Sequence, residues 1–272
     1  MKLKFSKIQG TGNDFIVINN LSGAFERFCG DLPVEETVKL LCSRRTGVGA
    51  DGLILIEDST VANFRWRFFN SDGSTAEMCG NGMRCVARFA FEEGLAPERM
   101  RVETGAGIVE AEVKGRNVKV KLTPPKDMRL NLSEGGITVH YIDTGVPHAV
   151  VFVDRLEDVE VGKLGRKIRF SELFSPRGAN VNFVEVRLDR IRVRTYERGV
   201  EGETLACGTG AVASALIAAK LFNLKSPVEV EVSSGERLKV YFDGELREVF
   251  LEGPTTWVYD GDLREEVLCG RG

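Results

Sequence analysis

Two copies of a Cys-Gly-X-Gly motif lie 128 residues apart in this chain, one beginning at Cys79 and the other at Cys207. Each copy opens a segment with helical spacing of apolar residues. Strand-like segments follow both helical segments, at residues 100–105 and 228–235. Two copies of about 130 residues fill the 272-residue chain, so the sequence predicts a duplicated domain. The turn-prone residues 123–127 are the expected seam.

The patterning of each copy predicts short strands around one central helix. Most segments are β-branched or alternate between apolar and polar residues. In the first copy the helix has an apolar face and is expected to expose Arg84 and Arg88; the apolar residues are Met83, Val86, Ala87, Ala90 and Phe91. In the second copy residues 211–219 are apolar almost all round, so other elements must wrap that helix. We therefore expect an α+β pseudo-dimer, with each half a curved, mostly antiparallel sheet closed around a central helix.

Charge and hydropathy exclude several classes of protein. The 37 Lys and Arg residues nearly balance 40 Asp and Glu residues, which argues against a general binder of nucleic acid or anionic membranes. No apolar run has the length of a membrane span or of a signal-peptide core, so we expect a cytosolic protein with reduced thiols. The six cysteines match no zinc or redox spacing. Four of them are expected to be small buried residues: Cys29, Cys42, Cys85 and Cys269.

The two remaining cysteines, Cys79 and Cys207, stand directly before the central helices. The first N–H groups of a helix have no intrahelical partner, and with the helix dipole they form a site for an anion such as a carboxylate. The same field favours thiolate over thiol and brings the thiol pKa towards neutrality. Such a thiol can act as a general acid or base. A buried structural cysteine is the alternative interpretation of each copy.

A pair of such thiols predicts inversion at carbon. If the two copies face each other, both helix N-termini can hold one carboxylate while the sulfurs lie on opposite faces of the adjacent carbon. One thiolate then removes a proton, and the other thiol returns one to the far face. This chemistry requires no redox cofactor. Asn70 and the Glu197-Arg198 pair stand at strand ends near the two helices, where Arg198 can grip a carboxylate and Glu197 can bind an ammonium group or tune a thiol.

The residues around both motifs resemble the diaminopimelate epimerase family. The resemblance rests on residues 11–15, 70–82, 145–148, 177–181 and 197–210, and it covers essentially the whole chain in order. The family consists of cofactor-independent two-base epimerases that interconvert LL- and meso-diaminopimelate for lysine and peptidoglycan synthesis. The resemblance implies two pseudo-symmetric domains, no cofactor, no metal and a small amino-acid substrate.

The resemblance also implies a role for individual residues. Cys79 and Cys207 become the proton donor and acceptor, and His148 and Glu197 adjust the two thiol pKa values. The implied ligands of the reacting carboxylate are Gly80, Asn81, Gly208 and Thr209, and those of the rest of the substrate are Asn13, Asn70, Asn180, Glu197 and Arg198. Tyr259 matches a homodimer contact of the family. The implied domains are residues 1–122 with 258–272, where the C-terminal strand returns to the first domain, and residues 123–257.

Two departures from the family pattern concern substrate specificity. Many members have a substrate-binding Gln where this chain has Gly52, and an Asn where it has Val146. A racemase of the same fold that acts on another amino acid is therefore an alternative function. From the residues alone, a reversible thiol switch built from Cys79 and Cys207 also stays open. A zinc site built from these cysteines and His148 is disfavoured by the ligand spacing.

Overall fold

The structure is a computed structural model that describes residues 2–269. The chain divides into two compact units. Unit 1 runs up to Val120 and resumes at Pro254, and unit 2 spans Lys121–Gly253. Within residues 2–269, no helix is long and apolar enough to cross a membrane.

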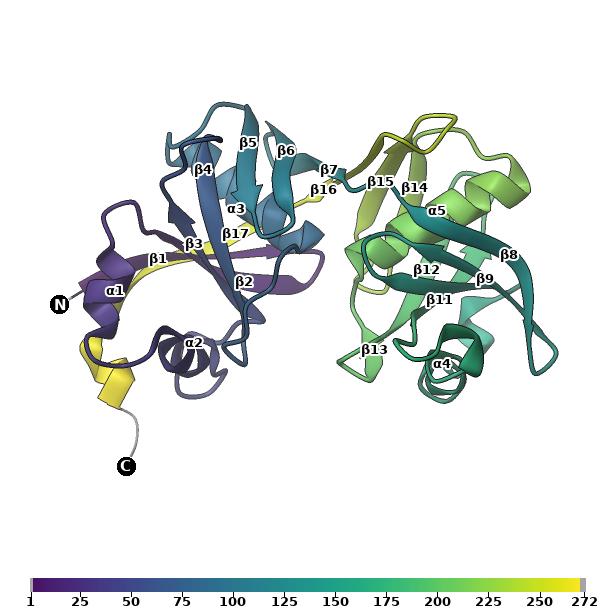
Figure 1. The fold of residues 1–272 in the computed structure, drawn as a ribbon, viewed down its shortest axis with the longest axis horizontal. Coiled ribbons are helices and arrows are strands. Elements are labelled where there is room, and N and C mark those ends of the chain that lie inside the picture. The colour runs from purple at the N-terminus through teal and green to yellow at the C-terminus, as the bar shows by residue number, and fades with distance from the viewer. Residues whose placement is uncertain (1, 270–272) are drawn as a thin grey trace. The chain divides into compact units, whose positions relative to one another are not determined.

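The sheet of unit 1 is mixed, with parallel pairs at β2–β3 and β4–β5 and antiparallel pairs elsewhere. In the order of their pairing, the strands are β17 (Thr256–Arg264), β1 (Lys2–Gly10), β2 (Asn13–Asn19), β3 (Gly52–Glu57), β4 (Phe64–Asn70), β5 (Arg99–Thr104), β6 (Gly107–Lys114) and β7 (Asn117–Leu122). Figure 1 shows the C-terminal β17, in yellow, running beside the N-terminal β1, in purple.

The helices of unit 1 lie in two connections of this sheet. Helices α1 (Ala24–Cys29) and α2 (Val34–Cys42) connect β2 to β3, and α3 (Gly80–Glu92) connects β4 to β5. Helix α3 packs against β1, β2, β3 and β6, so the sheet curls around it. The chain then ends in the short helix η3 (Glu265–Cys269).

Unit 2 repeats the same order of pairing. Its strands are β8 (Lys126–Glu134), β9 (Ile137–Asp143), β10 (Pro147–Phe152), β11 (Asn180–Val186), β12 (Ile191–Glu197), β14 (Val228–Val232), β15 (Arg237–Phe242) and β16 (Val249–Pro254), with the short β13 (Gly202–Thr204) against β12. The parallel pairs are β10–β11 and β12–β14, at the same places in the order as in unit 1.

The helices of unit 2 also occupy equivalent connections. Between β10 and β11 lie η1 (Leu156–Asp158), α4 (Val161–Arg169) and η2 (Glu172–Phe174), and α5 (Gly208–Phe222) precedes β14. Helix α5 packs against β9, β10, β11, β12, β14 and β15, which explains why a helix that is apolar almost all round is stable here. The expected fold of two sheets, each around a central helix, is confirmed.

The two repeats exchange their last strands. Strand β8 lies 130 residues before β17 and is its equivalent, so the first repeat extends past the seam expected at residues 123–127, but β8 pairs with β9 in unit 2. Strand β17 ends the second repeat, but it pairs with β1 in unit 1. Each sheet is therefore completed by a strand from the other repeat.

The exposure of three residues differs from what the sequence predicts. Arg84 is fully buried, because α3 is surrounded by the sheet and the guanidinium Nη2 donates to Thr11 Oγ1 and Asn81 Oδ1, both at 3.0 Å. Arg88 is also largely covered, and its Nη1 donates to the carbonyl of Thr255 at 2.8 Å. Cys269 is exposed in η3, although Cys29, Cys42 and Cys85 are buried as expected.

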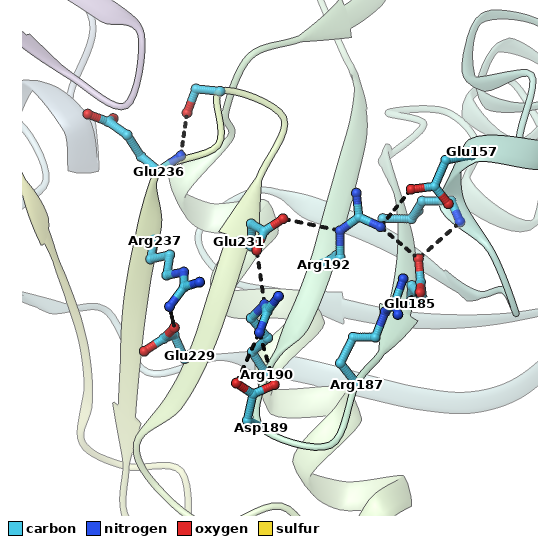
Figure 2. Close-up of polar contacts among 12 residues, drawn as sticks. Glu157, Glu185, Arg187, Asp189, Arg190, Arg192, Glu229, Glu231, Glu236 and Arg237 are labelled. Atoms are coloured by element: carbon cyan, nitrogen blue, oxygen red, sulfur yellow. Dashed lines mark hydrogen bonds and ion pairs between the residues drawn. The ribbon is translucent and has the colours of Figure 1, made fainter.

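A ladder of ion pairs crosses strands β11, β12 and β14 of unit 2, as Figure 2 shows. At its centre, Arg192 pairs with Glu157 at 2.7 Å, Glu185 at 3.1 Å and Glu231 at 3.2 Å. The Glu185 side chain is only 5% exposed, so its carboxylate has lost most of its hydration. The ion pair with Arg192 compensates for part of that loss. Arg192 therefore connects β12 to η1, β11 and β14 through ion pairs.

We expect Arg192→Met to destabilise unit 2 by about 2 kcal/mol, because the nearly buried carboxylate of Glu185 loses a partner. Thermal unfolding measures this loss. Arg237→Met is the matched control, because Arg237 is 55% exposed and pairs only with Glu229 in the described contacts of this ladder. That change should cost at most about 0.5 kcal/mol. Equal losses in the two variants would contradict the central role of Arg192.

Candidate active site

Cys79 is the N-cap residue of α3. Its backbone is extended, with φ −146° and ψ 118°, and its Sγ accepts a hydrogen bond from the Gly82 N–H at 3.4 Å. Gly80 and Asn81 form the first turn of the helix, where helix geometry leaves the backbone N–H groups without intrahelical acceptors. The thiol thus lies at the positive end of the helix, as the sequence predicted.

The amide groups of Asn13 and Asn81 connect this thiol to charged residues. Cys79 Sγ lies 3.7 Å from Asn13 Oδ1, and Asn81 Nδ2 donates to the same oxygen at 3.3 Å. Asn13 Nδ2 donates to the Asp51 carboxylate at 2.8 Å, and Arg84 Nη2 donates to Asn81 Oδ1 at 3.0 Å. A carboxylate only accepts and a guanidinium only donates, so both amides have one possible orientation.

A partly exposed charge cluster holds Asp51 in turn: Arg44 and Asp51 are 61% and 41% exposed, whereas Lys7 is largely covered. Arg44 Nη2 contacts Asp51 Oδ1 at 2.7 Å and Asp14 Oδ1 at 3.0 Å, and Lys7 Nζ lies 2.7 Å from Asp14. Burial raises the pKa of Asp14, but hydrogen bonds from Arg44 and Lys7 outweigh it and lower the pKa to about 2. Asp51 and this cluster were not predicted, because nothing in the local sequence indicates that they lie beside Asn13.

Asn70 and Gly52 are neighbours at the ends of β4 and β3. Asn70 Nδ2 donates to Ser74 Oγ at 3.0 Å, within the turn that follows β4. A Cβ atom at Gly52 would lie 2.6 Å from the Phe69 carbonyl oxygen and 2.7 Å from the Phe68 ring. A Gln at this position therefore requires the Phe69 backbone or the Phe68 ring to shift. Family members with Gln here must differ from this chain in the packing around the residue as well as in its side chain.

Cys207 occupies the equivalent N-cap position on α5. Its backbone is extended, with φ −121° and ψ 110°, and its side chain is 8% exposed. Its Sγ lies 3.5 Å from Thr209 Oγ1, in the first turn that begins at Gly208. The Thr209 carbonyl accepts a hydrogen bond from Thr144 Oγ1 at 3.2 Å, which ties this turn to the β9–β10 connection.

His148 and Asn180 are paired residues on the parallel strands β10 and β11. His148 is fully buried, and burial followed by the nearby charge of Arg198 lowers its pKa to about 3. Asn180 Nδ2 donates to the Pro147 carbonyl at 3.3 Å, and Asn180 Oδ1 accepts from the Arg198 N–H at 2.8 Å. Asn180 therefore fixes the backbone of both neighbours.

The remaining predicted residues lie at different places in their units. Glu197 ends β12 and accepts a hydrogen bond from Thr204 Oγ1 at 2.8 Å. Tyr259 lies on β17 and is 43% exposed, with its ring against Phe5 at a centroid distance of 5.8 Å. Unit 1 thus brings together Asn13, Cys79, Gly80 and Asn81, and unit 2 brings together His148, Asn180 and Arg198.

The surroundings of the two cysteines differ at one equivalent position. Phe15 and His148 open the equivalent β2–β3 and β10–β11 ladders, and two residues before them Val146 takes the place in unit 2 that Asn13 takes in unit 1. The thiol of Cys79 has the amide of Asn13 beside it, but an aliphatic side chain stands at the equivalent place in the unit of Cys207.

Among residues 2–269, no group of three or more His, Cys, Asp or Glu residues is arranged to hold a metal ion.

Comparison with known proteins assigns the whole chain to one group. The profile of the family described as diaminopimelate epimerase matches residues 5–127 and 140–258. The chain is 52% identical to the diaminopimelate epimerase of Aquifex aeolicus over 98% of this chain and 99% of that protein. It is 47% identical to the diaminopimelate epimerase of Hydrogenobaculum over 97% and 99% of the two chains.

Solved structures share the fold at low sequence identity. A PhzF-family phenazine biosynthesis protein from Bacillus anthracis is 16% identical with a TM-score of 0.72, covering 97% of this chain and 99% of that one. A probable proline racemase from Agrobacterium radiobacter is 15% identical with a TM-score of 0.69, covering 96% and 93%. These likenesses concern the fold alone.

Proposed function

This chain belongs to the diaminopimelate epimerase family, and we propose that it interconverts LL- and meso-2,6-diaminopimelate by proton transfer between two thiols. The observation that carries the proposal is the cysteine at the N-cap of the central helix in both units. The enzyme is an isomerase, and we propose that its reaction serves the synthesis of lysine and peptidoglycan precursors. Free thiols require reducing conditions, which supports an activity in the cytosol.

The proposed reaction begins with capture of the α-carboxylate. The first-turn amides of α3 and α5, at Gly80, Asn81, Gly208 and Thr209, donate to its oxygens, and the helix dipoles stabilise the negative charge that develops as the α-proton leaves. Fixed donors of this kind are most effective when water is excluded from the reacting carbon.

The proton transfers conserve charge. One cysteine, as thiolate, removes the α-proton and becomes a thiol, while the other cysteine, as thiol, gives a proton to the opposite face and becomes a thiolate. The carbon is inverted, and the two cysteines have exchanged their protonation states. We propose that His148 and Glu197 set these states, and that Asn13, Asn70, Asn180, Glu197 and Arg198 bind the remainder of the substrate. No electron is transferred, so the proposed reaction needs no redox cofactor.

Solvent isotope incorporation tests this proposal. We expect LL-diaminopimelate incubated in D₂O, without added pyridoxal phosphate, to form the meso isomer with deuterium at the inverted α-carbon. NMR and mass spectrometry measure the label and its position. Formation of the meso isomer without deuterium would rule out proton exchange through solvent-equilibrated thiols, and no reaction would rule out the substrate.

A racemase for another amino acid is the second candidate, because Gly52 and Val146 depart from the family pattern. A panel of amino acids, with and without a second carboxylate, compares the two candidates by kcat/KM. We expect diaminopimelate to have the largest value, because Arg198 offers a bidentate site for a distal carboxylate. A larger kcat/KM for a monoamino acid would replace diaminopimelate as substrate.

We also propose that the enzyme is a homodimer that uses β17. Val258 and Tyr259 are adjacent on this strand and are 52% and 43% exposed, so a second chain that covers β17 would bury apolar surface. We expect Tyr259→Asp to convert the dimer to monomer, since a carboxylate would be desolvated in the interface. Light scattering after size exclusion measures the mass. Leu188→Asp is the control, because Leu188 is fully exposed in unit 2. A dimeric Tyr259→Asp variant would contradict this contact.

A further inference from the structure

The duplicated fold provides an internal comparison for the surroundings of His148. His148 pairs with Asn180 and Phe15 pairs with Gly52, at the same step of the β10–β11 and β2–β3 ladders. Two residues further along β11 and β3 lie Asn182 and Ile54.

A third pair of equivalent positions lies on the neighbouring strands β12 and β4. Asn182 pairs with Thr195 on β12, and Ile54 pairs with Phe68 on β4. Unit 2 thus has the polar set His148, Asn182 and Thr195, where unit 1 has Phe15, Ile54 and Phe68.

The fold itself does not require this polar set. In unit 1 the same three positions are apolar and buried, and the rings of Phe15 and Phe68 pack edge to face with centroids 5.8 Å apart. In unit 2 all three polar side chains are at most 3% exposed. Burying polar groups costs free energy that an apolar set would avoid. Packing alone therefore does not explain the polar set.

The contacts of Asn182 leave its amide one orientation. Asn182 Nδ2 lies 3.1 Å from the Ala149 carbonyl oxygen, which can only accept a hydrogen bond. Asn182 Oδ1 accepts a hydrogen bond from Thr195 Oγ1 at 2.9 Å. A flipped amide would place two oxygens together at Ala149. The NH₂ group is therefore fixed on the side of Ala149.

The same NH₂ group lies 3.2 Å from His148 Nδ1. Because an amide nitrogen only donates, Nδ1 must accept, and the proton of the neutral imidazole must be on Nε2. We propose that Asn182 is a positioning residue that holds His148 as the neutral Nε2–H tautomer. An imidazolium would direct its Nδ1–H at the hydrogens of the same amide, so this contact also opposes protonation.

In this tautomer the Nε2–H of His148 is the ring's one hydrogen-bond donor. Within residues 2–269, His148 Nε2 is buried without a hydrogen-bond partner. Leaving a buried N–H unpaired is unfavourable, and a thiolate or a substrate carboxylate would remove that penalty by accepting a hydrogen bond from it. His148 then acts as a hydrogen-bond donor and not as a base. This role rests on the proposed function, whereas the tautomer does not.

Asn182 also contacts the helix that Cys207 begins. A Cβ atom at Gly210 would lie 2.3 Å from Asn182 Oδ1, so only glycine permits this close approach to the first turn of α5. At Gly82, the equivalent glycine of α3, the nearest atom is Ile54 Cδ1 at 3.3 Å. Asn182 thus lies between His148 and the turn that carries Cys207.

Nitrogen-15 NMR of the imidazole rings in the substrate-free protein tests the tautomer. The chain has only two histidines, and His148→Phe assigns their signals. His140 is an internal reference, because its Nδ1 accepts from the Asn131 N–H at 3.2 Å and it must also be the Nε2–H tautomer. We expect His148 to show an unprotonated Nδ1 and a protonated Nε2 at pH 7. A protonated Nδ1 would overturn the proposal, whatever the enzyme's activity.

Two variants then test the role of Asn182. In Asn182→Ile, which copies unit 1, we expect His148 to lose its single tautomer, with Nδ1 protonated in part of the molecules. Asn182→Asp, whose carboxylate can accept from Nδ1–H, should reverse the tautomer. Ser214→Ala is the control, because Ser214 is fully buried and its Oγ donates to the Gly210 carbonyl at 2.7 Å in the same turn. It should leave the tautomer unchanged.

The outcomes separate this proposal from the proposed function. An unchanged His148 spectrum in folded Asn182→Ile would overturn the role of Asn182, even if the enzyme epimerises diaminopimelate. If neither variant folds, the spectrum of the original protein still decides the tautomer. If the tautomer is as expected but no deuterium enters diaminopimelate, the positioning role stands and the proposed substrate falls.

Discussion

Cys79→Ala and Cys207→Ala are each expected to lower the rate of epimerisation by about 10³-fold or more, because each removes one of two groups that must act in the same turnover. The loss should appear in kcat with little change in substrate binding, since the first-turn amides of both helices remain. Circular dichroism of the diaminopimelate isomers measures the rate. Full turnover by either variant would contradict the two-base assignment.

The two variants should also differ from each other. The single remaining thiol can reach one face of the α-carbon, so each variant should exchange the α-hydrogen with D₂O in only one of the two isomers, with retention of configuration. The preferred isomer should be opposite in the two variants. Cys85→Ala is the matched control, since Cys85 is a buried thiol on α3 and burial raises its pKa far from neutrality. It should epimerise at close to the original rate.

His148→Phe is expected to make the fold markedly more resistant to acid. Burial lowers the pKa of His148 to about 3 in the folded protein, whereas the pKa of an unfolded histidine is 6.5. Between these values the unfolded state binds more protons, so stability is fully present above about pH 6.5 and is lost progressively as the pH falls towards 3. Phenylalanine, the residue at the equivalent position of unit 1, does not titrate.

The expected size of this effect follows from the width of the pH window. Between pH 7 and pH 5, the original protein should lose about 2 kcal/mol more stability than His148→Phe, and about 3 kcal/mol more by pH 4. Urea denaturation at each pH measures the difference. His140→Phe is the control: burial also lowers the pKa of His140, but that side chain is less deeply buried and should give a smaller change. Parallel pH profiles for the original protein and His148→Phe would show that His148 is protonated in the folded state.

The repeat and the motifs were sufficient to predict the fold class and the placement of the two cysteines. In an alternating segment such as 228–232, the apolar side chains share one face of the strand, which must be the face toward the core. Val228, Val230 and Val232 are indeed buried. Both central helices begin directly after the cysteine of the motif, where the glycines permit the tight entry into the helix.

Other features could not be predicted because they depend on contacts between distant segments. A helical projection assigns Arg84 to solvent, but the sheet around α3 buries it and Thr11 and Asn81 accept its hydrogen bonds. Asp51 reaches Asn13 only through the β2–β3 pairing. Asn182 had a local signal, since it is a polar residue within the apolar run 181–184, but only the ladders revealed its relation to His148.

The exchange of last strands has a consequence for the order in which the protein folds during synthesis. Domains of a growing chain ordinarily fold in order from the N-terminus. Here every strand of the unit 2 sheet, from β8 to β16, has been synthesised before β17 emerges, whereas the unit 1 sheet waits for β17 to cover β1. The unit that contains the N-terminus is therefore the last to be completed, and the unpaired edge of β1 needs protection from other chains until translation ends.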